Sequence, residues 1–182
     1  SIKDCGAWET VSSNCRENFV QTAESAGSLF EARLFNIVRA ATLAFLQRRK
    51  SLFDKRVQSG KIRDCHGDLR AEHVYFIDGK VRIIDCIEFN RRFRYEDTVS
   101  DLAFLAMDLD SRGHEQTAQL LMTEYTERSR DVDLFALINF YKCYRAMVRL
   151  KVGCIRMRES DLSETEKNRL LREIAHYLNL AY

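Results

Sequence analysis

The sequence lacks proline altogether and has only 7 glycines among its 182 residues. Proline interrupts a helix by removing a backbone donor, and glycine weakens a helix through its conformational freedom. A chain with so few of these residues can form long, uninterrupted helices. We therefore expect a helix content well above that of an average globular domain.

The chain also lacks an excess of one charge. Its 29 Lys and Arg residues stand against 27 Asp and Glu residues, so the formal net charge is +2. This balance gives no reason to expect a nucleic acid or an acidic membrane as a partner. With 46% hydrophobic and 31% charged residues, the composition is that of one soluble globular domain over residues 1–182.

Long hydrophobic runs and paired cysteine motifs are missing as well. No stretch reads as a signal segment or a membrane span, so no membrane partner is expected. The 6 cysteines include no Cys-x-x-Cys pair of the kind that binds zinc or carries redox chemistry. We expect a cytoplasmic protein with reduced cysteines. Because the cysteine count is even, a secreted protein is the alternative.

Apolar residues recur at three-to-four-residue spacing over most of the chain, which predicts amphipathic helices. The clearest is one long helix over residues 30–57, stopped by Gly60. The first dozen residues have no such period, and we expect a frayed start. Asp131 and Ser163 are the expected N-caps, the latter with Glu166 at capping-box spacing. Further helices are predicted over residues 15–26, 97–111, 115–128, 131–156 and 163–180.

The centre of the chain changes character. Two β-prone runs, Val74–Ile77 and Lys80–Ile84, flank the dipeptide Asp78-Gly79, which is a strong signal for a two-residue hairpin turn. The turn fixes the register, so Ile77 pairs with Lys80 and Val74 with Ile83. The sequence therefore predicts a mainly α (α+β) domain built around one small β-hairpin.

Acidic and imidazole groups gather at this hairpin. The register places Glu72, His73 and Asp85 at its open end, with Asp68 one short loop away. Carboxylates on short side chains suit Mg²⁺ that bridges phosphates, and a carboxylate without a metal can accept a proton from a hydroxyl nucleophile. The alternative is an acidic surface cluster beside a histidine whose hydrogen bonds the protein satisfies. A further alternative is a metal hydrolase, whose whole site would be His66, Asp68, His73 and Asp85.

Three ordered motifs in this region resemble those of the aminoglycoside phosphotransferase-like kinases. His66–His73 is similar to the family's catalytic loop, Ile83–Asn90 to its metal-binding segment, and Asp101–Leu105 to the helix that follows. The resemblance extends over about residues 30–156. It implies the helical C-terminal lobe of a protein-kinase-like fold, and an ATP-dependent phosphotransferase that acts on a hydroxyl of a small molecule.

Position by position, the resemblance implies a role for each matching residue. Asp68 would be the catalytic base that orients and deprotonates the substrate hydroxyl. Asp85 would hold Mg²⁺ on the phosphates of ATP. Arg70 would balance charge on the transferred phosphoryl group. His66 would shape the loop by hydrogen bonding, and Asp101 would anchor the loop from the helix below it.

One position departs from the family pattern. His73 stands where the family has Asn as a second metal ligand, and imidazole is a poor ligand for Mg²⁺. Strict strand alternation also puts His73 and Asp85 on opposite faces, unless the ladder ends or bulges there. Either one metal is lost, or Glu72 or Glu88 supplies the missing ligand. The candidate metal ligands are thus Asp85, His73 and Glu88.

The lobe that covers the nucleotide in such kinases is not recognisable in the sequence. No Gly-x-Gly-x-x-Gly and no Val-Ala-x-Lys run precedes the catalytic loop. We expect a fragment of a longer protein, with the missing N-terminal lobe as a partner of this chain; the alternative is that the lobe comes from elsewhere. The alternative function is a catalytically inactive, pseudokinase-like binding or regulatory module.

Candidates for substrate contacts are weaker. In the resembling kinases the later helices help to form the acceptor pocket, which suggests Tyr144, Arg145 and Arg149, the two arginines sharing a helix face. Core and rim packing is the alternative for these three residues. The basic run Arg91–Arg94 is read as a solvated surface, with an anionic substrate or partner as the alternative.

Overall fold

A computed structural model describes residues 1–182 and confirms the mainly α prediction, since 69% of the residues are helical and only two small two-stranded sheets are present. The first half of the chain contains η1 (Ile2–Gly6), α1 (Trp8–Thr22), η2 (Ala23–Ser25), α2 (Ala32–Arg48), α3 (Lys50–Gln58), β1 (Ile62–Asp64), η3 (Ala71–His73), β2 (Val74–Ile77) and β3 (Lys80–Ile83). The second half contains α4 (Arg91–Arg94), β4 (Tyr95–Asp97), α5 (Thr98–Ser111), α6 (Glu115–Ser129), α7 (Leu134–Arg156) and α8 (Glu164–Ala181).

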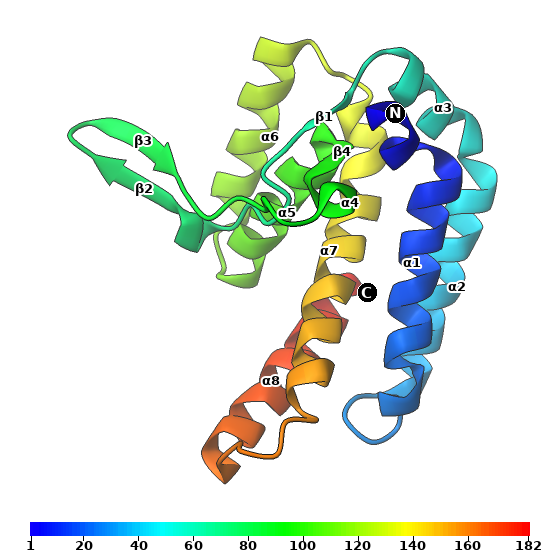
Figure 1. The fold of residues 1–182 in the computed structure, drawn as a ribbon, viewed down its shortest axis with the longest axis vertical. Helices are drawn as coiled ribbons and strands as arrows, with labels where there is room; N and C mark the ends of the chain where they lie inside the picture. The colour runs from blue at the N-terminus through cyan, green and yellow to red at the C-terminus, as the bar shows by residue number, and fades with distance from the viewer.

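Helix α7 is the centre of the helical body. It packs against α5, α8 and α1, and Figure 1 shows it running through the molecule with α1 and α2 alongside. Leu134, Leu137 and Leu150 of α7 are fully buried, so the helix carries apolar residues on more than one face. None of the helices is apolar over a length sufficient to cross a membrane.

The N-terminal segment differs from its prediction. The expected frayed start is wrong, because η1 and α1 are ordered and α1 packs into the core. Val11, Cys15 and Phe19 are buried at four-residue spacing, and the Trp8 indole Nε1 donates a hydrogen bond to the Leu46 carbonyl at 2.8 Å. The helical signal was weak because polar residues lie between these core positions, and one of them, Ser12, is itself buried.

Other boundaries follow the sequence more closely. The long helix predicted over residues 30–57 is broken at Arg49 into α2 and α3. Gly60 has a φ of +64° just after α3, as expected for a helix stop. Ser163 and Glu166 form the predicted capping box at the start of α8. Asp131 is not an N-cap, since the residue at that position is Asp133.

The hairpin forms in the predicted register, with Val74 opposite Ile83 and Ile77 opposite Lys80. Asp78 and Gly79 both have positive φ, at +51° and +70°, as a tight type I′ turn requires. The hairpin projects from the helical body (Figure 1), and the side chain of Phe76 is 80% exposed. A second sheet was missed: β1 pairs antiparallel with β4, and these strands are too short for a periodic signal.

A buried ion network connects α3 to two other parts of the chain. One is Asp97, which directly precedes α5, and the other is Asp131, between α6 and α7. The Arg56 guanidinium donates to Asp97 at 2.8 and 2.6 Å and also pairs with Asp131, and all three residues are almost completely buried. This is why Asp131 does not cap α7. Arg56 is the cation paired with Asp97, and Asp131 has a second, more distant partner in Lys61 at 3.4 Å.

Replacing Arg56 with Met is expected to lower the free energy of unfolding by about 3–5 kcal/mol, because buried Asp97 loses its counter-ion and buried Asp131 keeps only Lys61 at 3.4 Å. Urea unfolding followed by circular dichroism measures the change. The control is Lys55→Met, which removes an exposed pair with Asp133 and should change stability by less than about 1 kcal/mol. Equal stabilities of the two variants would contradict the role of Arg56.

Candidate functional site

The loop from His66 to His73 is fixed from below by α5 and α7. The Asp101 carboxylate accepts the backbone N–H groups of His66 at 2.8 Å and Gly67 at 3.0 Å. The Arg145 guanidinium donates to the Gly67 carbonyl at 3.1 Å. Gly67 has a φ of +83°, and a Cβ there would lie 2.5 Å from the Phe93 carbonyl oxygen, so only glycine fits. The predicted anchoring contact of Asp101 is therefore present.

His66 makes the loop-shaping contacts expected of it. Its Nε2–H donates to the Ile84 carbonyl at 2.8 Å, and its Nδ1 accepts the Asp68 backbone N–H at 3.3 Å. The ring also stacks on that of His73, with centroids 5.6 Å apart. His66 thereby connects the His66–His73 loop to Ile84, which lies between β3 and Asp85.

Asp68 and Arg70 form a two-point ion pair. Arg70 Nε and Nη2 donate to the two carboxylate oxygens of Asp68 at 3.1 and 3.0 Å, and Arg70 also contacts Glu72. Burial alone would lower the pKa of Arg70, but the hydrogen bond to Asp68 and the surrounding carboxylates raise it. The Asp68 side chain remains 29% exposed, so the carboxylate is accessible.

The end of the hairpin ladder brings Asp85 to the same side as His73. The Ile84 N–H donates to the His73 carbonyl at 3.1 Å, and Asp85 then adopts a φ of +64°. This left-handed residue interrupts the strand alternation that would have separated the two side chains. As a result, Asp85 Oδ2 lies 3.6 Å from His73 Nε2, and Asp68 Oδ2 lies 4.0 Å from His73 Nδ1. One imidazole ring thus stands between the two carboxylates.

The predicted metal ligands fit Mg²⁺ unequally. His73 Nδ1–H donates to the Asp68 carbonyl at 2.8 Å, and His73 Nε2 accepts from Arg70 at 3.4 Å. Both ring nitrogens are therefore engaged in hydrogen bonds within the loop. Glu88 is exposed, and its one side-chain hydrogen bond is from the Cys86 thiol at 4.0 Å, away from the other two ligands. No group of three or more His, Cys, Asp or Glu side chains has metal-binding geometry. Asp85, exposed and without a salt bridge to Lys or Arg, fits an Mg²⁺ that takes most of its ligands from phosphate and water.

A cleft of about 200 Å³ opens beside Asp68, between α1 and α7. Gly67 and Asp68 line it from the loop, and Tyr144 and Arg145 line it from α7. The last two are among the three weaker candidates for substrate contacts. Arg92, from the basic run considered above, also lines the cleft. Sequence reasoning missed the other polar side chains that complete the wall, which are Asn14, Glu17, Asn18 and Lys151.

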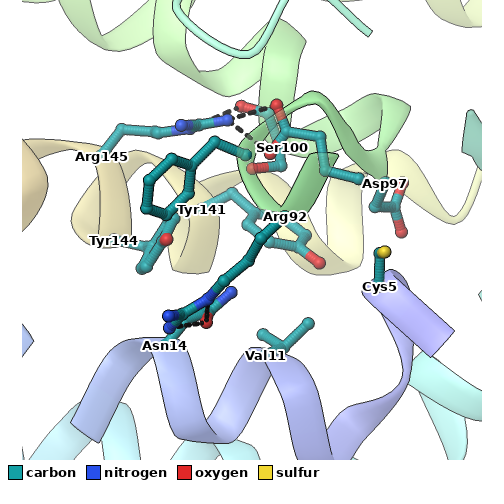
Figure 2. A pocket seen from close by; sticks show the side chains of 11 residues that line it. Cys5, Val11, Asn14, Arg92, Asp97, Ser100, Tyr141, Tyr144 and Arg145 are labelled. Atoms are coloured by element: carbon teal, nitrogen blue, oxygen red, sulfur yellow. Dashed lines mark hydrogen bonds and ion pairs between the residues drawn. The ribbon is translucent and has the colours of Figure 1, made fainter. Parts of the chain in front are cut away.

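Arg145 and Arg149 do not share a site. Arg145 is buried and donates to Glu96, the Ser100 carbonyl and the Gly67 carbonyl, and Figure 2 shows its guanidinium beside Ser100. Burial raises the pKa of Glu96 to about 7, although Arg145 opposes the shift. Arg149 lies over the Tyr177 ring of α8, 5.5 Å from its centroid, and does not line the cleft. Residues four apart are offset by about 40° around a helix, which is enough to direct these two to different neighbours.

The basic run Arg91–Arg94 lies at the surface as predicted, with Arg91 and Arg92 exposed, and two of its arginines also pair with neighbouring acids. Arg92 donates to the Asn14 amide oxygen at 2.9 Å (Figure 2) and pairs with Glu17, while Arg94 pairs with Asp64. Arg92 therefore connects the segment after the hairpin to α1. Its position in the cleft wall leaves the anionic-substrate interpretation open.

Comparison with known proteins finds relatives without an assigned activity. Uncharacterized proteins of Mycobacterium tuberculosis and Mycobacterium bovis are 34% identical to the chain over 146 residues, which is 80% of this chain. The chain spans 29% of the length of these relatives. No protein-family model matches the chain, and no solved structure matches it.

Replacing Asp101 with Asn should loosen the loop, because a hydrogen bond to a charged acceptor contributes about 1.5–3 kcal/mol. Hydrogen exchange at the His66 and Gly67 amides is expected to accelerate by at least tenfold. The control is Asp110→Asn on the same helix, which removes a pair with Lys142 and should leave these amides unchanged. Unchanged protection in Asp101→Asn would contradict the anchoring role.

Proposed function

We propose that this chain is the catalytic lobe of an ATP-dependent phosphotransferase that acts on a hydroxyl of a small molecule. Support comes from the resemblance of three ordered motifs to aminoglycoside phosphotransferase-like kinases and from the arrangement of the residues in those motifs. The single observation that carries the proposal is that Asp68 and Asp85 approach opposite nitrogens of one imidazole, His73, next to a cleft.

The two carboxylates have different surroundings, which suits different tasks. Asp68 borders the cleft and would accept the proton of the acceptor hydroxyl while the hydroxyl oxygen forms a bond to the γ-phosphorus. The bond from that phosphorus to the β–γ bridging oxygen breaks, and ADP leaves. Arg70, which pairs with Asp68, would also stabilise the negative charge of the transferred phosphoryl group. Asp85 would hold Mg²⁺, which neutralises phosphate charge when bound.

The exposed apolar side chains of the hairpin are the observation that favours a second lobe packed next to the site. Apolar side chains remain exposed on β2 and β3, and an isolated two-stranded hairpin is marginally stable in water. We propose that a nucleotide-covering lobe, encoded in the rest of a longer protein, packs against this hairpin. The relatives, of which the chain spans 29%, are long enough to contain such a lobe.

A binding module without transfer is the second candidate. Both carboxylate oxygens of Asp68 are engaged by Arg70, and His73 offers Mg²⁺ a poor ligand. A site in this state could hold a nucleotide and leave the acceptor untouched. Binding of Mg²⁺-ATP without phosphorylation of any acceptor would favour this candidate.

Substituting Asp68 or Asp85 in the full-length protein separates the two roles. Asp68→Asn keeps the shape of the side chain and should lower turnover by about 10²–10⁴-fold, because a general base is lost. Asp85→Asn retains a residue that tolerates positive φ and should weaken Mg²⁺-dependent ATP binding by at least tenfold. Transfer of ³²P to a metabolite panel and calorimetric binding of ATP provide the readouts.

Asp78→Asn is the matched control, since Asp78 also has positive φ but lies at the exposed hairpin tip. It should change neither readout. Normal turnover in Asp68→Asn, or normal Mg²⁺-ATP affinity in Asp85→Asn, would refute the proposed mechanism.

A further inference from the structure

The cleft beside Asp68 contains a lysine without an acidic partner. Lys151 of α7 is half-buried, and its Nζ donates to the side-chain oxygen of Asn18 at 2.7 Å. No carboxylate lies within 4.0 Å of this ammonium. Burial lowers the pKa of Lys151, while the more distant Glu17 acts in the opposite direction.

The other charged groups of the cleft are already paired. Arg92 pairs with Glu17, Asp68 with Arg70 and Arg145 with Glu96. Lys151 is therefore the one charged side chain in the cleft wall that has no oppositely charged side chain within 4.0 Å.

Asn18 supplies an independent sign of a missing acceptor. This residue is only 3% exposed, and its side-chain Nδ2 has no hydrogen-bond partner although its oxygen accepts from Lys151. Buried donors are almost always satisfied, so an unpartnered amide in a cleft wall points to a bound group. The Lys151 ammonium has further N–H donors beyond the one bound to Asn18, and the Asn18 Nδ2 has no acceptor.

We infer that Lys151 and Asn18 bind the carboxylate of a small polyhydroxylated acid. A carboxylate matches one ammonium and one amide, whereas a phosphate dianion is usually held by more donors. The cavity of about 200 Å³ admits a compound of this size. This assignment rests on the proposed function in one respect, namely that a hydroxyl of the same molecule faces Asp68.

The spacing along α7 separates Lys151 from the loop by a distance that a linear compound can span. Arg145 contacts the loop at Gly67, and Lys151 lies six residues further along the helix, which corresponds to roughly 9 Å. The lysine side chain shortens the span that the ligand must bridge. A linear sugar acid can then place its carboxylate at Lys151 and a distant hydroxyl at Asp68.

Three linear six-carbon compounds that differ at one carbon test the inference. Gluconate carries a carboxylate, sorbitol a hydroxyl and glucamine an amine at that position. Calorimetry on the full-length protein should show gluconate binding at least tenfold more tightly than sorbitol, with glucamine the weakest. Lys151→Met should reduce gluconate affinity by about tenfold or more, and Lys151→Arg should retain part of it.

Lys142→Met is the matched control on the same helix, because Lys142 pairs with Asp110 and does not line the cleft. It should leave gluconate affinity unchanged. Equal affinities for the three compounds, absence of gluconate binding, or no effect of Lys151→Met would overturn the inference.

Acceptor phosphorylation is scored separately from binding. Tight gluconate binding that depends on Lys151, without transfer from ATP, would leave the carboxylate site standing and remove the proposed function. Transfer to neutral or amino acceptors that is unaffected by Lys151→Met would do the reverse.

Discussion

The candidate site depends on one carboxylate, that of Asp101, which accepts two successive backbone N–H groups of the loop. Asp108 of the same helix, α5, accepts the Ala71 N–H at 2.9 Å. The helix itself is capped by Asp97, which accepts the Val99 N–H at 3.0 Å. Asp101 and Asp108 thus attach the loop to α5 at two points, and Asp68 lies between them in sequence. These attachments are made to backbone amides, and the glycine at position 67 and the imidazoles of His66 and His73 add further constraints on the loop conformation.

A short hairpin and one left-handed residue then complete the site. The hairpin returns the chain to the loop, and the positive φ of Asp85 directs its side chain toward His73 instead of the opposite face. His73 donates a hydrogen bond from its Nδ1–H to the Asp68 carbonyl and stands between the two carboxylates. A residue that the motif comparison treats as a poor metal ligand is therefore well suited to spacing two acids that would otherwise repel each other.

Local patterns in the sequence were sufficient for the parts of the fold that local chemistry determines. The Asp78-Gly79 turn fixed the hairpin register, and Ser163 with Glu166 marked the start of α8. Tertiary contacts decided the rest. Asp131 resembles an N-cap but is bound to Arg56, which is 75 residues away in sequence, and Lys151 meets Asn18 across 133 residues. No spacing rule connects such positions, which is why most of the polar wall of the cleft was missed while Asp68 and Asp85 were found.

A crystal structure of the full-length protein with Mn²⁺ and a non-hydrolysable ATP analogue tests the central claim most directly. The account predicts anomalous density for Mn²⁺ at the Asp85 carboxylate, with the terminal phosphate on the side of the metal that faces Asp68. Mn²⁺ and nucleotide bound elsewhere on the protein, with Asp85 uninvolved, would contradict it.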